Sequence, residues 1–357
     1  MQAIILVGGE GTRLRPLTYT TPKQMLPIVG RPMLEWVFAH LRRHGIDEVI
    51  LSLGYLPDAF AEAYPEGEIN GVRLRYAVEP ERLDTAGAIR FAARSAGVAD
   101  TFVVLNGDVL TDLNVTELVD FHRANGALGT LALHEVEDPS AFGVVPTDPR
   151  GRVLEFVEKP APGSAPTNRI NAGTYVLEPA VLELIPEGRR VSVERETFPL
   201  LVEQGLLYAA PGNCYWLDAG TPIAFLQAHF DVLDRVRGSE DFITATYDAE
   251  CWREVDAELQ GDASGNTYLA TGSTVARGAR VEHSMVGANV VVAPGATVID
   301  SVLLAGAHVG AGAVVEHSIV GPRGVVGDAA ELHALSVVGA GIEVPNGVVL
   351  FAERLPA

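Results

Sequence analysis

The sequence predicts an α/β domain with a mostly parallel sheet, followed by a parallel β-helix. As far as about residue 235, apolar runs of strand length alternate with stretches of helical period, which is typical of α/β domains. From about residue 268 the chain becomes rich in glycine, alanine and valine, and small aliphatic residues recur at a regular spacing. Such a spacing is typical of a repeat that coils on itself.

The apolar periodicity defines the elements of the first domain. Five runs are expected to be strands: Ala3–Val7, Val49–Leu53, Val72–Val78, Phe102–Leu105 and Leu128–Leu133. Five stretches are expected to be helices: Met33–His44, Ala86–Ala96, Val115–Ala124, Val193–Glu203 and Pro222–Arg237. In a domain of this kind, ligands bind beyond the carboxyl ends of the strands.

The repeat that follows has a period of 17 residues. The positions one period apart are Val281, Val298, Val315 and Leu332, and the serines Ser284, Ser301 and Ser318 share the interval. Between these positions the aliphatic residues are separated by five or six residues, which is no α-helical period. A three-sided coil of hexapeptides with one shortened face gives this spacing. We therefore expect about four coils of a left-handed parallel β-helix.

Three segments are expected along the chain. Residues 1–237 form the α/β domain, residues 238–264 form an acidic connector, and residues 265–357 form the β-helix. The connector is predicted because residues 239–262 hold eight acids and one base, Arg253, with little periodicity. We expect it to be solvated or to lie over the first domain.

Composition excludes several classes of partner. The chain has 26 basic and 46 acidic side chains, and its formal charge of −20 argues against nucleic acid or an anionic membrane as the main partner. It begins without the features of a signal peptide and holds no run of about 18 apolar residues that would span a membrane. Cys214 and Cys251 form no pattern, so we expect reduced thiols and a cytoplasmic location.

A glycine-rich loop follows the first expected strand. Gly8, Gly9 and Gly11 would let backbone N–H groups approach an oxyanion closely, as they do where such loops bind phosphate. The loop lacks the Gly-Lys-Ser/Thr of a P-loop, and it lacks the third glycine of a dinucleotide-binding turn because position 14 is leucine. With Thr12 and Arg13 it predicts an anion site, the alternative being a tight turn needed only for packing.

The glycine-rich loop is the first of several segments that together resemble a known protein family. Gly8–Pro16 followed by Pro22–Pro27 resembles the signature of the sugar nucleotidyltransferases, or nucleotide-sugar pyrophosphorylases. Further matching segments follow in the order of that family: Asn106–Asp108, Phe142–Val144, Glu158–Pro160, Asn171–Gly173 and Trp216–Gly220. The resemblance implies a Rossmann-like nucleotidyltransferase domain with a mixed, mostly parallel sheet. It also implies that a sugar 1-phosphate oxygen attacks the α-phosphorus of a nucleoside triphosphate and releases pyrophosphate.

Three basic residues resemble the catalytic residues of the family. Arg13 has the planar fork that suits phosphate oxygens. Lys23 resembles the lysine that meets the triphosphate, and Lys159 resembles the one that holds the sugar phosphate and supports its attack. The chain has 24 arginines and these two lysines alone, and both lysines lie in family motifs, which indicates sites that need a compact ammonium. The alternative for Lys159 is an exposed loop charge.

The resemblance also implies a nucleotide site and a metal site. The nucleotide set is Gly8, Gly9, Gly11, Thr12, Arg13, Lys23, Glu79, Thr85, Gly87 and Asp108. Glu79 can accept hydrogen bonds from both the N1–H and the exocyclic amine of guanine. The alternative for Glu79 is an acid on the surface at the end of a strand. Asp108 and Asp218 come from distant segments and can hold Mg²⁺ against phosphates, the alternative for each being a turn-forming aspartate.

The implied sugar-phosphate site consists of Gly143, Glu158, Lys159 and Asn171. Glu158 and Asn171 can hydrogen-bond hydroxyl groups, and the Gly143 backbone leaves room for a ring. This indicates a polyhydroxylated six-membered ring without defining its epimer. The family implies a hexose 1-phosphate as the partner of the triphosphate.

Within the family, the sequence most resembles mannose-1-phosphate guanylyltransferases, which implies GTP, mannose 1-phosphate and GDP-mannose. Asp84 replaces a common glycine, and Lys23-Gln24 resembles thymidylyltransferases. A thymidylyl- or uridylyltransferase acting on glucose 1-phosphate therefore stays open, as does a regulatory homologue that binds nucleotide sugar without catalysis. An acyltransferase is disfavoured because the β-helix offers no evident basic cradle. We expect the β-helix to assemble the chain into a homo-oligomer.

Overall fold

The computed structural model describes residues 1–236 and 245–356. The chain divides into two compact units, each made of two stretches of sequence. The first unit is Met1–Gly9 with Val37–Trp216, and the second is Glu10–Trp36 with Leu217–Ala357.

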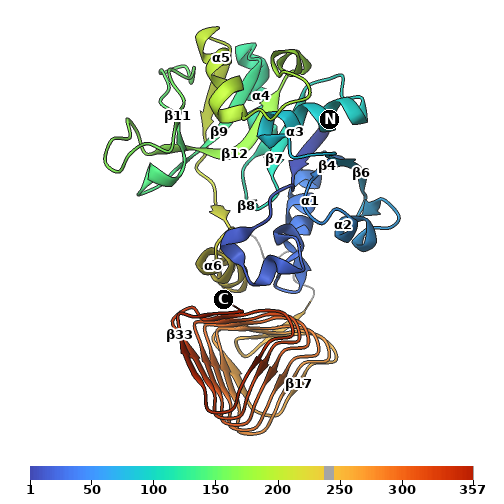
Figure 1. Ribbon diagram of the computed structural model, residues 1–357, viewed down its shortest axis with the longest axis vertical. Helices are drawn as coiled ribbons and strands as arrows, with labels where there is room; N and C mark the ends of the chain where they lie inside the picture. Colours follow the sequence, from blue (N-terminus) through green and yellow to red (C-terminus); the bar gives the residue numbers. More distant parts are fainter. Residues whose placement is uncertain (237–244, 357) are drawn as a thin grey trace. The chain divides into compact units, whose positions relative to one another are not determined.

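The first unit is built on a mixed sheet, which confirms the Rossmann-like fold (Figure 1). Its described strands run in the order β11-β10-β12-β7-β1-β4-β6-β5, and β9 lies between β12 and β13. The bounds are β1 Gln2–Leu6, β4 Glu48–Leu53, β5 Glu68–Ile69, β6 Val72–Val78, β7 Phe102–Asn106, β9 Gly129–Glu135, β10 Gly143–Val144, β11 Val157–Glu158, β12 Arg169–Leu177 and β13 Leu207–Pro211. Strands β1, β4, β6 and β7 are parallel, whereas β12 is antiparallel to β7 and β9.

The five strands expected from apolar periodicity are all present, but β12 was not expected. Its sequence starts with polar residues and includes Gly173 at φ +73°, so it lacks the apolar run of a central strand. The register of β12 with β9 also shifts between Asn171 and Tyr175. The bulge therefore interrupts the alternation that would have indicated a strand.

The described helices lie close to their expected positions, except that Asp58–Ala63 was not expected and that Arg237, the expected end of the last helix, lies outside the described residues. They are α1 Met33–Arg43, α2 Asp58–Ala63, α3 Asp84–Ala96, α4 Val115–Asn125, α5 Phe198–Glu203 and α6 Pro222–Leu233, and β8 is Val109–Thr111. The expected helix Val193–Glu203 is divided into a π-turn, Val193–Thr197, and α5. Pro199 explains the break, because a residue without a backbone N–H suits the first turn of a new helix rather than a helix interior.

The core of the first unit lies between the sheet and the helices packed on it. Ile4 of β1 pairs in register with Ile50 of β4 and with Val104 of β7, and all three are fully buried. Ile89 of α3 and Phe198 of α5 belong to the same buried cluster. Each such side chain contributes about 1.5–3 kcal/mol of hydrophobic stabilisation, so the strands that carry the loops described below are rigidly held.

The second unit contains the left-handed parallel β-helix, whose three-sided coils are visible at β17 and β33 (Figure 1). One sheet contains β15 Thr246–Asp248, β16 Cys251–Arg253, β19 Thr267–Leu269, β22 Met285–Val286, β25 Val302–Leu303, β28 Ile319–Val320, β31 Val337–Val338 and β34 Arg354–Leu355. The next contains β17 Glu258–Leu259, β20 Thr274–Val275, β23 Val291–Val292, β26 His308–Val309, β29 Val325–Val326 and β32 Glu343–Val344. The third contains β18 Asp262–Ser264, β21 Arg280–Glu282, β24 Thr297–Ile299, β27 Val314–Glu316, β30 Glu331–His333 and β33 Val349–Phe351.

The coil extends beyond the four turns expected from the repeat. Among the described residues, two of its sheets have six strands each. Val281, Val298, Val315 and Leu332 stack in register as predicted, but the next step, from Leu332 to Leu350, is 18 residues. This one-residue insertion breaks the period of 17, which is why the sequence pattern ended too early.

The predicted connector is partly built into the coil. Residues 237–244 lie outside the described residues, whereas β15 to β18, between Thr246 and Ser264, form the first strands of the three sheets. Strand β18 pairs with β21 through Ala263 and Val281. Five of the six described acids of this stretch are exposed, so they belong to the outer surface of a first coil that carries few valines. A domain division at residues 237 and 265 stays a prediction.

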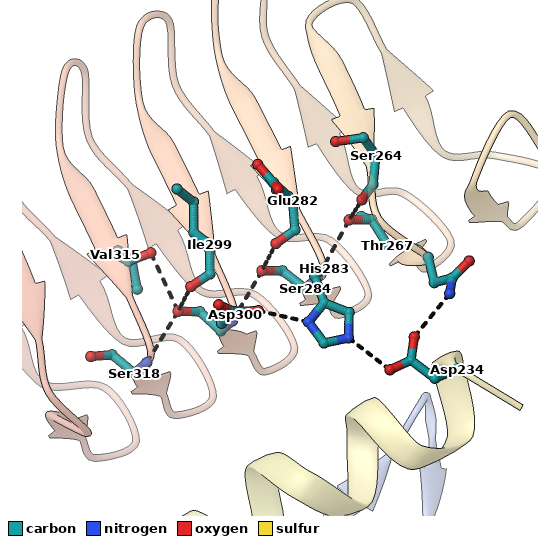
Figure 2. Close-up of polar contacts among 12 residues, drawn as sticks. Asp234, Ser264, Thr267, Glu282, His283, Ser284, Ile299, Asp300, Val315 and Ser318 are labelled. Carbon is teal, nitrogen blue, oxygen red and sulfur yellow. Dashed lines mark hydrogen bonds and ion pairs between the residues drawn. The ribbon is translucent and has the colours of Figure 1, made fainter. Parts of the chain in front are cut away.

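The serine repeat has a structural cause. Ser284, Ser301 and Ser318 are fully buried. The Ser301 hydroxyl donates to the carbonyl of Ile299 at 2.6 Å and accepts from the Ser318 N–H at 3.1 Å, and the Ser284 hydroxyl accepts from the Ser301 N–H at 3.0 Å (Figure 2). The hydroxyls of Ser284 and Ser301 thus satisfy backbone groups of their own coil and of the next one, which a buried corner requires.

The second unit also contains the segment that follows the glycine-rich loop. This segment includes the hairpin of β2, Pro27–Ile28, and β3, Arg31–Pro32. Strand β14, Trp216–Asp218, starts with the last residue of the first unit and ends in the second. Helix α6 packs on β2, and Nδ1 of buried His229 accepts from the Val29 N–H at 3.2 Å. No helix among the described residues is long and apolar enough to cross a membrane.

Candidate functional site

The carboxyl ends of the parallel strands bring the first predicted nucleotide-binding residues together. Gly8 follows β1, Gly54 follows β4, and Glu79 follows β6. A Cβ on Gly54 would lie 3.2 Å from the Gly8 carbonyl oxygen, and a Cβ on Gly8 would lie 3.4 Å from Oε1 of Glu79. A side chain at Gly54 would press on the backbone of Gly8, whereas one at Gly8 would be in ordinary contact with Glu79, so the loop after β1 packs closely against its neighbours.

Glu79 is half-buried and held in place, rather than a mobile surface acid. Its Oε1 accepts from the Ser52 hydroxyl at 3.2 Å, and its Oε2 accepts from the Leu83 N–H at 2.9 Å. Burial raises the pKa of the carboxyl, and these two hydrogen bonds oppose that shift. An oriented carboxylate at the edge of a sheet is suited to accept hydrogen bonds from a ligand.

The first turn of α3 is tied to the segment before α5. The Thr85 hydroxyl donates to Oε2 of Glu194 at 2.8 Å and accepts from the Val193 N–H at 2.8 Å. The Gly87 N–H donates to the carbonyl of Val191 at 3.2 Å. Through these contacts Thr85 and Gly87 hold the start of α3 against residues 191–194. Their role in nucleotide binding stays a prediction.

Asp108 lies at the same carboxyl edge, in the turn that follows β7, two residues after Asn106. The intervening Gly107 has no room for a side chain, because a Cβ would lie 2.6 Å from Cγ1 of Val7. Its N–H donates to the carbonyl of Leu6 at 3.0 Å. The sequence Asn-Gly-Asp therefore needs glycine so that the chain can pass β1 and present Asp108 at the edge of the sheet.

The predicted sugar-phosphate residues cluster around β10 and β11. Gly143 and Glu158 pair across the two strands, and a Cβ on Gly143 would lie 2.7 Å from the Phe156 ring and 3.1 Å from Oε2 of Glu158. The next residue, Lys159, donates its N–H to the Phe142 carbonyl at 3.0 Å. Its Nζ lies 3.7 Å from Oε1 of Glu158, and 60% of its side chain is exposed. The ammonium is therefore oriented yet open to an anion.

Asn171 is held at the bulge of β12. Its Nδ2 donates to the Tyr175 hydroxyl at 2.9 Å, and its Oδ1 accepts from the Gly173 N–H at 3.0 Å. Burial raises the pKa of Tyr175, and the charges of Glu194 and Glu158 raise it further, so this tyrosine stays neutral and keeps its O–H. Tyr175 connects the three predicted or motif residues around it, although no sequence pattern had singled it out.

An aromatic group borders the same cluster in the first unit. The Trp216 ring stacks on His134 with centroids 5.2 Å apart and meets Phe142 edge-on at 5.7 Å. Its Nε1 donates to the Ala172 carbonyl at 2.8 Å. His134 was not expected, because a lone histidine in a strand gives no sequence signal for such a contact.

In the second unit, Gly11 and Lys23 lie in contact. Gly11 has φ +62°, and a Cβ would lie 3.0 Å from Cγ2 of Thr18 and 3.1 Å from Cβ of Lys23. The Thr18 hydroxyl donates to the Gly11 carbonyl at 2.8 Å. Gly11 also precedes the short 3-10 turn Thr12–Leu14, so both predicted binding segments of this unit are packed against each other.

Arg13 and Asp218 form an ion pair in the same unit. Nη2 of Arg13 lies 3.3 Å from Oδ2 of Asp218, and Oδ1 of Asp218 accepts from the Gly220 N–H at 2.9 Å. A Cβ on Gly220 would lie 2.7 Å from Nη2 of Arg13 and 2.7 Å from Oδ1 of Asp218, so a side chain here would displace the ends of both groups. The Arg13 side chain is 60% exposed, so its guanidinium is available to a phosphate.

The donor set for a metal ion consists of carboxylates. Among the described residues, no group of three or more His, Cys, Asp or Glu side chains could hold a metal ion. Asp108 and Asp218 offer hard oxygen donors, and an ion such as Mg²⁺ takes one or two protein carboxylates while substrate phosphates and waters complete its shell. The role of Asp108 and Asp218 as ligands of one metal ion stays a prediction.

Two family models match the chain. The model described as nucleotidyl transferase matches residues 2–235, and the one described as GMPPB C-terminal domain matches residues 263–355. The first covers more than half of the chain, which therefore belongs to the nucleotidyl transferase family. Proteins of this family bind a nucleotide and a sugar phosphate and generally use a divalent metal ion.

The similar proteins agree with this family. A mannose-1-phosphate guanylyltransferase of Mycobacterium tuberculosis is 42% identical over 79% of this chain and 76% of its own length. A UTP–glucose-1-phosphate uridylyltransferase of Synechocystis is 34% identical over 85% of this chain and 82% of its own. The crystal structure of HddC from Yersinia pseudotuberculosis complexed with GMP-PN has a TM-score of 0.55 and 29% identity, and it covers 64% of this chain and 97% of that one.

Proposed function

We propose that the chain condenses GTP with mannose 1-phosphate to give GDP-mannose and pyrophosphate. A phosphate oxygen of mannose 1-phosphate attacks the α-phosphorus of GTP, and the bond from that phosphorus to the β-phosphate oxygen breaks as pyrophosphate leaves. The observation that best supports this substrate pair is the anchored, half-buried carboxyl of Glu79 beside Gly8. Guanine offers two adjacent N–H donors to such a carboxylate, whereas uracil and thymine offer one.

The reaction requires positioning and charge neutralisation rather than a covalent nucleophile. In this proposal the backbone of Gly8, Gly9 and Gly11, with Thr12, binds the triphosphate. The side chains of Arg13 and Lys23 neutralise its oxygens. The exposure of the Arg13 guanidinium supports this role.

Lys159 holds the phosphate of the sugar and keeps it near the α-phosphorus. Glu158 beside it and Asn171 bind ring hydroxyls, and Gly143 leaves space for the ring. The 3.7 Å separation of the Lys159 ammonium and the Glu158 carboxylate supports this division, because the two groups present one donor and one acceptor side to the same ligand.

The divalent ion of the proposal is Mg²⁺. Asp108 and Asp218 would hold it, and it would neutralise charge on the phosphates. Three further proposals concern the whole chain: a division at residues 237 and 265, a homo-oligomer assembled through the β-helix, and a cytoplasmic location that keeps Cys214 and Cys251 reduced. Free cysteines at both positions support the last of these.

A matrix of triphosphates against sugar 1-phosphates tests the proposal. Purified full-length chain with Mg²⁺ is offered GTP, ATP, UTP and dTTP, each with mannose or glucose 1-phosphate, and pyrophosphate release is followed with chromatographic identification of the product. We expect the highest turnover with GTP and mannose 1-phosphate. The second candidate, favoured by the Synechocystis uridylyltransferase, predicts UTP with glucose 1-phosphate instead. A chain that binds GDP-mannose but releases no pyrophosphate from any pair would be a regulatory homologue.

A further inference from the structure

Arg354 connects the β-helix to the glycine-rich loop within the second unit. Its Nη1 donates to the carbonyl of Arg13 at 3.0 Å and to the carbonyl of Arg15 at 3.2 Å. These acceptors lie 341 and 339 residues away in sequence. One guanidinium nitrogen therefore holds the last part of the 3-10 turn Thr12–Leu14 and the residue that ends it.

The backbone that carries Arg354 is itself fixed. Strand β34 pairs with β31, placing Arg354 opposite Val337 and Leu355 opposite Val338. The Val337 N–H donates to the carbonyl of Glu353 at 2.7 Å, and Val338 is fully buried. The exposed guanidinium thus extends from a backbone that is hydrogen-bonded into the coil.

A second contact lies beside the first. A Cβ on Gly339 would lie 3.1 Å from Cβ of Pro16 and 3.0 Å from the carbonyl oxygen of Leu355. The turn after β31 therefore meets the loop directly, one residue beyond Arg15. Packing and hydrogen bonding from the same end of the coil converge on residues 13–16.

The loop is held differently at its two ends. The carbonyls of Gly11 and Thr12 accept from Leu14 and Arg15 within the loop, at 2.9 and 3.3 Å. The carbonyl of Arg13 accepts from Arg354, while the Arg13 side chain pairs with Asp218. The orientation of the Arg13 guanidinium is thus set from both sides, by a carboxylate on its side chain and a cation on its backbone.

From this geometry we propose that Arg354 is a positioning residue for residues 13–16. It fixes the backbone from which the Arg13 side chain reaches the phosphates of the triphosphate. This inference rests on the proposed function and adds that the β-helix contributes to triphosphate binding. Loss of Arg354 leaves the charge of Arg13 intact but lets its backbone move, so the effect falls on the triphosphate rather than on the sugar phosphate.

The test compares Arg354→Ala with Arg354→Lys and with Arg280→Ala, which removes an equal charge from β21 where Arg280 pairs with Glu282. For the triphosphate that the wild type turns over fastest, we expect KM to rise about tenfold in Arg354→Ala. The KM for the sugar phosphate should change less than twofold, Arg354→Lys should recover part of the loss, and Arg280→Ala should match the wild type. A lower melting temperature with an unchanged triphosphate KM would overturn the proposal.

Two readouts separate a positioning role from a structural one. In an Arg13→Ala background, adding Arg354→Ala should change the triphosphate KM less than twofold, because the residue it acts through is gone; a full additional loss would contradict the proposal. Hydrogen exchange of residues 10–19 should also be faster in Arg354→Ala than in Arg280→Ala, and this needs no substrate. Altered exchange in a chain that prefers another substrate pair would therefore refute the proposed function while keeping the role of Arg354.

Discussion

Asp218 divides its carboxylate between two partners, with Oδ2 lying 3.3 Å from Nη2 of Arg13 and Oδ1 accepting from the Gly220 N–H at 2.9 Å. Asp218, which we propose as a metal ligand, is therefore paired with Arg13, which we propose as a ligand of the phosphates. When nucleotide and Mg²⁺ bind, Arg13 can exchange this carboxylate for phosphate oxygens. The pair keeps both groups oriented before substrate arrives, which reduces the reorganisation needed for reaction.

The substitution Asp218→Asn tests this exchange. An asparagine oxygen can still accept from the Gly220 N–H, but its neutral side chain binds Mg²⁺ poorly. We expect kcat to fall about 100-fold and the Mg²⁺ concentration for half-maximal rate to rise. Titrating Mg²⁺ against pyrophosphate release measures both, with Asp256→Asn on the exposed surface as the matched control. An unchanged Mg²⁺ dependence would remove Asp218 from the metal site.

The substitution Lys159→Arg tests the need for a compact ammonium. Lys159 is largely exposed, and its side chain makes one ion pair, 3.7 Å from Glu158. We expect kcat to fall about 100-fold. The arginine side chain is longer, and its charge is spread over a planar guanidinium instead of being held on a compact ammonium. The melting temperature should stay within about 1 °C of the wild type, since exposed pairs contribute little stability. Full turnover by this variant would show that the position needs only a positive charge.

Glu79 predicts a pH dependence specific to GTP. Because burial raises its pKa, its carboxylate is protonated at a higher pH than an ordinary glutamate. A protonated carboxyl cannot accept from both guanine donors, so KM for GTP should rise as pH falls through this raised pKa. The same group costs folding free energy as pH rises from the unfolded pKa through the folded one, because folding then disfavours the charged form.

The matched variant is Glu79→Gln, whose amide does not titrate in this range. Its KM for GTP should be higher at neutral pH and should lose the acid-dependent rise, while UTP should gain relative to GTP. Initial rates from pH 5 to pH 8 for both proteins measure this. A parallel pH profile in the variant would assign the dependence to another group.

The serine ladder, which consists of the stacked residues Ser284, Ser301 and Ser318, predicts an effect on stability without an effect on catalysis. Ser301→Ala removes the hydroxyl that accepts from the Ser318 N–H and leaves that buried donor unsatisfied. We expect the free energy of unfolding to fall by about 1–3 kcal/mol, measured by denaturant titration. Thr274→Ala, on the more exposed face of β20, is the control, and its unfolding free energy should change by less than about 0.5 kcal/mol. Equal losses in both variants would argue against the ladder.

Much of this architecture follows from local sequence patterns. The run Val49–Leu53 predicted a strand because a buried parallel strand is nearly continuously apolar, whereas Val72–Val78 predicted one because buried and exposed residues alternate along it. The valine period predicted the stacked coils, and the glycines after β1 predicted a loop that approaches its neighbours closely. These features depend on residues near one another in sequence, so their periodicity is visible without the fold.

Other features depend on contacts between distant residues. Asn171 donates to the Tyr175 hydroxyl across the register shift of β12, and the charges of Glu194 and Glu158 raise the pKa of Tyr175, yet no local pattern signals that bulge. The Arg354 side chain donates to the Arg13 carbonyl across 341 residues. The coil number was underestimated because the first coil lies in the acidic stretch and because one inserted residue breaks the period between Leu332 and Leu350. Such features need three-dimensional packing to become apparent.

The central claim is that this chain selects guanine and a mannose ring. Its most direct test is the ratio of kcat/KM for GTP with mannose 1-phosphate to that for UTP with glucose 1-phosphate, measured on the wild type with Mg²⁺. Selection through two hydrogen bonds to Glu79 predicts a ratio of at least about 100. A ratio below one would contradict the account and make the chain a uridylyltransferase.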